Sequence, residues 1–135
     1  MHGGKPFGAV VVLDGKIVAQ GVNQVDASKD PTAHAETVAL RSACLKTQSL
    51  EIPRSTVFAS GQPCVMCQSL AYSCGVSEMV FALSAAECAK SGWRFKAGSL
   101  ELLDAWTQSL PGFTRQLSIE GSREPFDLWL QKNTF

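Results

Sequence analysis

Hydrophobic and polar positions near the start of the chain follow the two-residue period of β-strands. Residues 9–13 and 16–22 are two β-rich runs, and Asp14-Gly15 separates them. This dipeptide readily adopts the positive φ angles of a two-residue hairpin turn. The pattern therefore predicts that an antiparallel hairpin opens the fold.

A helix, a strand, a second helix and a second strand follow in the pattern. The helix over residues 33–46 has apolar side chains at helical spacing after the helix-start sequence Asp-Pro-Thr. Residues 56–60 read as a short buried strand, Pro63 opens a helix toward Cys74 and Gly75, and residues 78–83 form another apolar strand. A strand–helix–strand unit of this size predicts a right-handed crossover between parallel strands. The predicted sheet is therefore mixed.

The last third of the chain predicts shorter elements. Ser84 and Glu87 have the spacing of a capping box, which predicts a short helix that ends near Gly92. Further elements are a helix over 100–110, a break at 111–112, an edge strand over 115–119 and a terminal helix over 124–132. Without repeats or linkers, residues 1–135 are expected to form a single α/β domain.

Composition narrows the class of function. The 135 residues are 45% apolar, and twelve basic side chains balance twelve acidic ones, so the net charge is zero. This balance argues against a nucleic-acid or membrane partner and favours a small-molecule substrate. Neither a signal peptide nor an apolar run of membrane-spanning length is evident, which predicts a cytoplasmic protein. Five cysteines in such a chain favour metal binding or thiolate chemistry over disulfides.

Three residues of the types that bind zinc stand in two short motifs. His34 lies in Thr-Ala-His-Ala-Glu, and Cys64 and Cys67 lie in Pro-Cys-Val-Met-Cys. Cysteines three residues apart on a helix face the same side, and a first helical turn stabilises thiolates. The sequence therefore predicts that two helix amino termini bring three ligands to one Zn²⁺ at the carboxyl edge of the sheet.

A fourth protein ligand is not expected. Cys74 and Cys44 each lie two or three helical turns from the predicted ligands, too far to share one metal. Cys88 and His2 are not excluded by spacing, although neither belongs to a motif. The fourth position is therefore expected to hold a water molecule, as in catalytic rather than structural zinc sites.

Glu36 is predicted to carry protons at this site. It lies two residues after His34, close enough to reach a metal-bound water without being a ligand. Hydrolytic deamination needs a water nucleophile, a proton for the ring nitrogen and a proton for the departing ammonia, and one carboxylate can move these protons. A structural zinc site is the alternative interpretation, but it needs no carboxylate at this position.

The spacing of these residues, His-x-Glu followed by Pro-Cys-x-x-Cys, resembles the signature of the zinc-dependent nucleobase and nucleoside deaminases. Residues 3–10 and 30–36 resemble the bacterial guanine deaminase branch. The resemblance covers roughly residues 3–83. It implies a three-layer α/β/α cytidine-deaminase-like fold with a mixed sheet of about five strands, a zinc cofactor, a homodimer and a flat base lying against the metal.

The resemblance also assigns substrate-binding residues. It places Asn23 where the family hydrogen-bonds the base edge, and an amide does offer both a donor and an acceptor. The backbone amide of Ala35 corresponds to one that meets the reacting ring, and Phe7 lies where an aromatic side chain packs on the base. The alternatives are that Asn23 closes a turn with Asp26 and that Phe7 belongs to the core.

Several positions depart from the family pattern. Relatives have a helix before residue 3, so without it the resemblance implies that one sheet face is covered by the terminal helix or by a partner subunit. Gln62 replaces a glutamate. Gly92-Trp93-Arg94-Phe95 stands where the guanine branch has an acidic residue for the exocyclic amine. Trp93, Phe95 and Phe135 are candidates either for closing over a base or for ordinary packing.

The sequence therefore predicts a zinc-dependent hydrolytic deaminase of a nucleobase or nucleoside, with guanine or a related aminopurine favoured. The alternatives are a cytosine- or cytidine-type deaminase, a transfer-RNA adenosine deaminase and a noncatalytic zinc-stabilised binding module. The neutral charge argues against the RNA substrate, because phosphate contacts normally supply much of the binding energy.

Overall fold

A five-stranded sheet forms the centre of the computed structural model, which describes residues 5–132. The strands have the order β2-β1-β3-β4-β5 across the sheet. Their bounds are β1 Gly8–Leu13, β2 Lys16–Val22, β3 Ser55–Gly61, β4 Glu78–Leu83 and β5 Thr114–Gln116. No helix among the described residues is long and apolar enough to cross a membrane.

The sheet is mixed, as the sequence predicts. β1 pairs antiparallel with both β2 and β3, whereas β3, β4 and β5 run parallel. Asp14 and Gly15 have φ angles of 51° and 76°, so the hairpin turn has the predicted left-handed conformation. The parallel pair β3 and β4 is connected through a helix, which confirms the predicted crossover.

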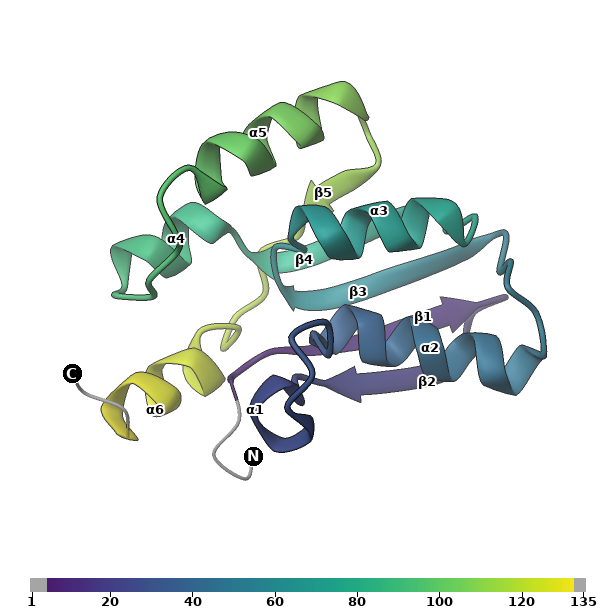
Figure 1. The fold of residues 1–135 in the computed structure, drawn as a ribbon, viewed down its shortest axis with the longest axis horizontal. Coiled ribbons are helices and arrows are strands. Elements are labelled where there is room, and N and C mark those ends of the chain that lie inside the picture. The colour runs from purple at the N-terminus through teal and green to yellow at the C-terminus, as the bar shows by residue number, and fades with distance from the viewer. Residues whose placement is uncertain (1–4, 133–135) are drawn as a thin grey trace.

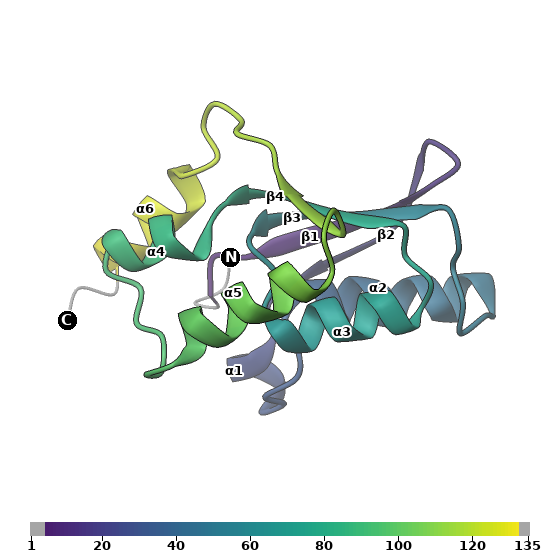
Figure 2. The same ribbon diagram turned by 90° about the horizontal axis from the view of Figure 1, so that it is seen from above.

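The longer helices lie on one face of the sheet. In Figures 1 and 2, helices α2, α3 and α5 lie on the same side of the strands, and α4 and α6 lie beyond one end of the sheet. The helix bounds are α1 Val25–Ser28, α2 Ala35–Thr47, α3 Val65–Ser73, α4 Ala85–Lys90, α5 Ser99–Ser109 and α6 Glu124–Lys132. The core between the sheet and α2 contains Val11, Val57, Met79 and Leu40, all at most 1% exposed.

The opposite face of the sheet has little helical cover within residues 5–132. A groove of about 810 Å³ lies there, between the strands and the segment 119–122, and Phe58 is 38% exposed. α6 reaches this groove only with Pro125. Its Phe126 instead packs at the end of the sheet against Leu83 and Cys88. The terminal helix therefore does not cover this face, in contrast to one of the two expectations from the sequence.

Several elements differ from the sequence prediction. α1 was not predicted, because four residues are too short to show a helical period. α2 begins at Ala35 rather than Ala33, since His34 has an extended backbone and forms the N-cap. β5 ends at Gln116, before the predicted limit of Ile119.

Gly21 sets the distance between β2 and α2. A Cβ atom at this position would lie 2.6 Å from both the Ala35 carbonyl oxygen and the Ala39 amide nitrogen. These are backbone atoms of the helix and cannot move aside as a flexible side chain would. The glycine therefore lets α2, which follows His34 directly, lie against the hairpin.

Substituting Gly21 with alanine should push α2 away from the sheet. We expect this change to lower the free energy of unfolding by about 1–3 kcal/mol, as overpacking typically does. Thermal or urea-induced unfolding measures the loss. Gly8→Ala is the matched control, because a Cβ there meets its nearest atom at an ordinary 3.7 Å; equal stability of the two variants would contradict the explanation.

Candidate active site

Two helices begin at the same place and each presents a predicted ligand at its N-cap. His34 is the N-cap of α2 and Cys64 is the N-cap of α3. Neither side chain accepts a hydrogen bond from its own helix, as N-cap side chains commonly do. Both side chains are therefore available to the space in front of the helix amino termini.

His34, Cys64 and Cys67 form a potential metal site. Their ligand atoms all lie within 4.8 Å of one another, and the Cys64 Sγ and His34 Nδ1 atoms are 3.5 Å apart. Tetrahedral zinc with bonds of about 2.0–2.3 Å places its ligand atoms roughly 3.3–3.8 Å apart. The donor set and its spacing therefore fit zinc. The Thr37 hydroxyl lies 3.4 Å from Cys67 Sγ and can donate a hydrogen bond to a thiolate there.

Other candidate ligands do not join this cluster in the described part of the chain. Cys88 lines the adjacent cavity, but it lies outside the group of three. Cys44 and Cys74 interact with each other instead. His2 lies outside the described residues. If these three residues of the described part of the chain bind one zinc, a tetrahedral position stays open, as in catalytic zinc sites.

The pKa values of the two cysteines in the cluster shift in opposite directions. A hydrogen bond from the Cys67 thiol, and another with His34, lowers the pKa of Cys64 to about 4. The Cys64 sulfur and burial raise the pKa of Cys67 far above its ordinary value. The pair therefore holds one proton that a divalent cation would displace on binding both sulfurs. The interaction with Cys64 also raises the pKa of His34.

Glu36 is buried beside this cluster. Its side chain is 6% exposed and comes from the first turn of α2, two residues after His34. Burial raises the pKa of this carboxyl group above its ordinary value. A raised pKa makes a carboxyl group hold its proton more firmly, which suits a group that must both accept and return a proton.

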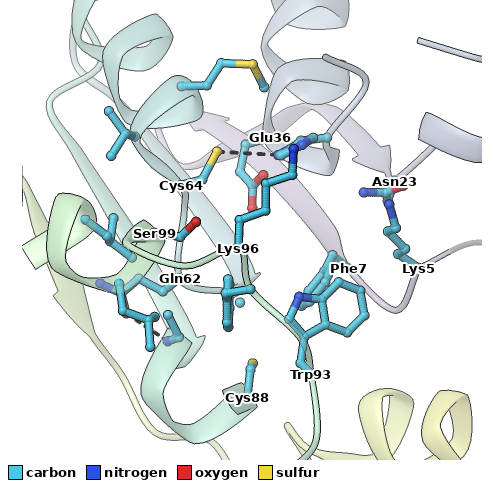
Figure 3. Close-up of a pocket in the computed structure, with 18 of the residues that line it drawn as sticks. Lys5, Phe7, Asn23, Glu36, Gln62, Cys64, Cys88, Trp93, Lys96 and Ser99 are labelled. Carbon is cyan, nitrogen blue, oxygen red and sulfur yellow. Dashed lines mark hydrogen bonds between the residues drawn. The ribbon is translucent and has the colours of Figure 1, made fainter. Parts of the chain in front are cut away.

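A cavity of about 610 Å³ opens over the cluster, and Figure 3 shows Glu36 and Cys64 at its inner end. His34, Asn23, Ala35 and Phe7 also line it. The cavity therefore brings the predicted catalytic residue, two of the three predicted ligands and all three predicted substrate-binding residues together. Cys67, the third ligand, is buried behind it.

Within the described part of the chain, one polar atom of the Asn23 side chain is hydrogen-bonded and the other is not. Its Oδ1 accepts a hydrogen bond of 3.1 Å from the amide of Val25, at the start of α1. This bond closes a turn with Val25 rather than with Asp26. It also fixes the side-chain amide, whose Nδ2 has no hydrogen-bond partner among the described residues. Ala35 is the first residue of α2, so its N–H has no partner within the helix.

Aromatic rings form one wall of the cavity. Phe7 packs edge-on against Trp93, with ring centroids 5.1 Å apart, and Gly61 leaves room for the Phe7 ring. Phe126 of α6 lies behind both rings, with centroids 6.3 and 5.9 Å away. Trp93 and Phe95 both line the cavity, whereas Phe135 lies outside the described residues. The terminal helix therefore supports the cavity wall.

Among the described residues, the cavity lining contains no acidic acceptor for an exocyclic amine besides Glu36. Gln62 stands at the end of β3, and its Oε1 accepts a hydrogen bond of 2.9 Å from Ala85, which ties β3 to α4. Glu36 is the one acidic residue among the described lining residues. The segment after α4 contributes Trp93, Arg94 and Phe95 to the lining, in agreement with the sequence.

Sequence reasoning missed the residues that close the far side of the cavity. These come from the start of α5 and the loop before it, and they include Lys96, Ser99, Leu100 and Leu103. Lys5 also lines the cavity, although the sequence analysis assigned no role to it within residues 3–10. No motif marks the α5 residues, because only the packing of α5 beside α3 brings them to the cavity.

Comparison with known proteins connects this geometry to a family. Residues 1–83 match the family model of the cytidine and deoxycytidylate deaminase zinc-binding region. The chain is 33% identical over 127 residues to the guanine deaminase of Bacillus subtilis, covering 93% of this chain and 80% of that protein. It is 32% identical over 76 residues to the tRNA-specific adenosine deaminase of Aquifex aeolicus, covering 56% of this chain and 50% of that protein.

Solved structures agree with the fold. The crystal structure of the Bacillus subtilis guanine deaminase superposes with a TM-score of 0.67 at 29% identity, covering 98% of this chain and 83% of that one. The predicted cytidine-deaminase-like fold with a mixed five-stranded sheet is thus confirmed.

Proposed function

Because this chain belongs to the zinc-dependent cytidine and deoxycytidylate deaminase family, we propose that His34, Cys64 and Cys67 bind its zinc and that Glu36 is the proton carrier of a hydrolytic deaminase. The observation that carries this proposal is the position of Glu36. Its buried carboxyl group lies beside three clustered ligands and lines the same cavity. A structural metal site would not need an acid there.

The reaction exchanges a ring amino group for a carbonyl oxygen and releases ammonia. When bound, zinc supplies a water nucleophile at neutral pH. Glu36 would accept the two protons of a water molecule one after the other, and would deliver the first to the ring nitrogen and the second to the departing amine, so that the ring gains a carbonyl oxygen and ammonia leaves. Burial of Glu36 keeps bulk water from competing for these protons.

Three residues are proposed to hold the base. The Asn23 amide would bond a polar edge of the ring, the Ala35 amide would meet the reacting end, and Phe7 would pack against the ring face. A purine fits easily in a cavity of about 610 Å³. The likeness to a guanine deaminase favours an aminopurine substrate over a cytosine-type base.

Replacing Asn23 with aspartate separates its two contacts. Aspartate keeps an oxygen for the Val25 amide but loses the Nδ2 donor. We expect kcat/KM to fall by roughly 10- to 100-fold, the usual effect of leaving a substrate group unpaired in a site built to bond it. Steady-state kinetics measures this loss, and Asn23→Ala should show at least as large a loss. If the aspartate variant kept the wild-type kcat/KM, the Nδ2 donor would have no role in substrate binding, and Asn23 would serve only to close the turn.

Ammonia release from a panel of compounds tests the proposed reaction. Zinc-loaded protein is incubated with guanine, adenine, cytosine, their nucleosides and related aminotriazines, with Glu36→Ala as the matched blank. We expect release that depends on Glu36, with an aminopurine ahead of the pyrimidines. Turnover of cytidine alone would show that the substrate is a pyrimidine. Turnover by the Glu36→Ala variant would contradict the proposed mechanism.

A homodimer and a role in purine metabolism are further proposals, which rest on the family resemblance. Light scattering of the zinc-loaded protein tests the first of them, since a dimer doubles the mass of 14.5 kDa calculated for one chain. A monomer that turns over substrate would show that the active site is complete in a single chain.

A further inference from the structure

A glutamine is fully buried in the first half of α3, directly after the two cysteines of the proposed metal site. Gln68 is 0% exposed and follows Cys67 in the chain. Its side chain carries an acceptor and two donors, and such a group is costly to bury unless these atoms are bonded. Gln68 is not among the residues that line the cavity. Its role is therefore to be sought in its contacts with the protein.

The Gln68 side chain bonds the backbone that precedes Cys64. Its Nε2 atom donates a hydrogen bond of 3.0 Å to the carbonyl oxygen of Pro63, a residue that is itself fully buried. The backbone amide of Gln68 donates a second bond, of 2.9 Å, to the carbonyl oxygen of Cys64. Gln68 therefore binds the carbonyl groups on both sides of Cys64.

These two bonds restrict the direction of the Cys64 side chain. The peptide group between Pro63 and Cys64 is planar, so a bond that fixes its carbonyl oxygen also fixes the plane in which the Cys64 nitrogen lies. Cys64 has an extended backbone, with φ −73° and ψ 171°, and its side chain makes no capping bond to the helix. The position of the Cys64 sulfur therefore depends on the backbone that Gln68 holds.

The first residue of the same turn is anchored to other elements. The Gln62 backbone amide donates a hydrogen bond of 2.7 Å to the Leu83 carbonyl oxygen, and its Oε1 accepts one of 2.9 Å from Ala85. These bonds tie the beginning of the turn to β4 and α4. Loss of the Gln68 side-chain bond would leave them in place and loosen the part of the turn that carries Cys64.

The second polar atom of the Gln68 amide argues against a purely stabilising role. Oε1 is buried and has no hydrogen-bond partner within residues 5–132. An unpaired buried acceptor destabilises a fold, so an apolar side chain of similar volume would avoid this cost. Exchanging Nε2 and Oε1 would bring two oxygen atoms together at Pro63, so the amide orientation follows from the Pro63 carbonyl.

We propose that Gln68 is a positioning residue of the metal site, which holds the Cys64 sulfur in place through the Pro63 carbonyl. The inference rests on the proposed zinc-dependent function and extends it to a residue outside both the three ligands and the cavity. Groups that orient a metal ligand without touching the metal typically contribute roughly 10- to 100-fold to metal affinity or activity.

Gln68→Met and Gln68→Leu remove the donor and fill the same space with apolar atoms. We expect each variant to bind zinc roughly 10- to 100-fold more weakly than the wild type in competition with a chelator. With Co²⁺ in place of zinc, the visible absorption bands, which report the ligand geometry, should shift or lose intensity. In zinc-saturated protein, kcat should fall while KM stays near wild type, because Gln68 does not line the cavity.

Ala71→Gly is the matched control for stability. Ala71 is also fully buried on α3, and glycine there weakens the helix without removing a hydrogen bond from Pro63 or Cys64. This variant should unfold at a lower temperature than the wild type. Below that temperature it should keep the wild-type zinc affinity and the wild-type Co²⁺ spectrum.

Wild-type zinc affinity and Co²⁺ spectrum in both Gln68 variants would overturn the inference. Unfolding of both variants under conditions in which Ala71→Gly stays folded would also overturn it, because Gln68 would then be needed for the fold as a whole. The proposed ligand set is judged on the wild-type protein. If the wild type binds no zinc, the proposed function and the inference both fail. If it binds one zinc per chain and the Gln68 variants bind equally tightly, only the inference fails.

Discussion

Replacing Glu36 with alanine should lower kcat by at least about 10²–10⁴-fold, the usual contribution of a general acid and base, while zinc content stays near wild type. Glu36 is not one of the three clustered ligands, so its loss should leave the metal affinity largely intact. The fold should also survive, because a buried carboxyl group is costly to keep in a folded protein. Ammonia release, zinc analysis and thermal unfolding measure the three effects together.

Glu36→Gln is the control for packing. The amide has nearly the same volume as the carboxylic acid, so it fills the buried space that alanine would leave empty. It cannot shuttle protons, and we expect activity as low as that of the alanine variant. A glutamine variant that retains most of the wild-type kcat would refute proton transfer by Glu36.

Replacing Cys67 with alanine should remove zinc and stability together. Cys67 is fully buried, and its sulfur is one of the three proposed ligand atoms, so the variant would offer two protein ligands to the metal. At structural zinc sites the apparent binding free energy is about 10–16 kcal/mol, and part of it is folding free energy. We expect zinc content to approach zero and the midpoint of thermal unfolding to fall well below that of the zinc-loaded wild type.

Cys88→Ala provides a matched cysteine substitution. Cys88 is also buried and lines the same cavity, but it lies outside the cluster. This variant should keep one zinc per chain and lose only the stability of a small buried side chain. Full zinc occupancy in the Cys67 variant, or zinc loss in the Cys88 variant, would show that the ligand set is wrong.

The sequence predicts the part of the molecule in which local chemistry determines structure. Asp14-Gly15 requires positive φ angles, and the structure has them. Ser84 and Glu87 predict a helix start, and the Glu87 amide donates a hydrogen bond of 3.0 Å to the Ser84 hydroxyl. Each of the two zinc-binding motifs is short and has residue types typical of zinc ligands. These features are sufficient to predict that His34, Cys64 and Cys67 lie close together.

The substrate-facing wall is harder to predict, because it depends on packing between distant segments. Trp93 follows no motif, and its place in the wall is set by contacts with Phe7 and with Phe126. The apolar side chains of α6 show that the helix must pack against something. They do not show that it packs at the end of the sheet rather than across its face.

The N-cap positions of α2 and α3 leave both helices with open first turns. Ser84 closes the first turn of α4 by accepting a hydrogen bond from the Glu87 amide, whereas His34 and Cys64 make no such bond. Coordination by these two side chains would anchor both helix ends to one shared cation. The cation would then join the amino-terminal ends of two helices that come from distant parts of the chain, and the order of the turn that carries Glu36 would depend on its being in place.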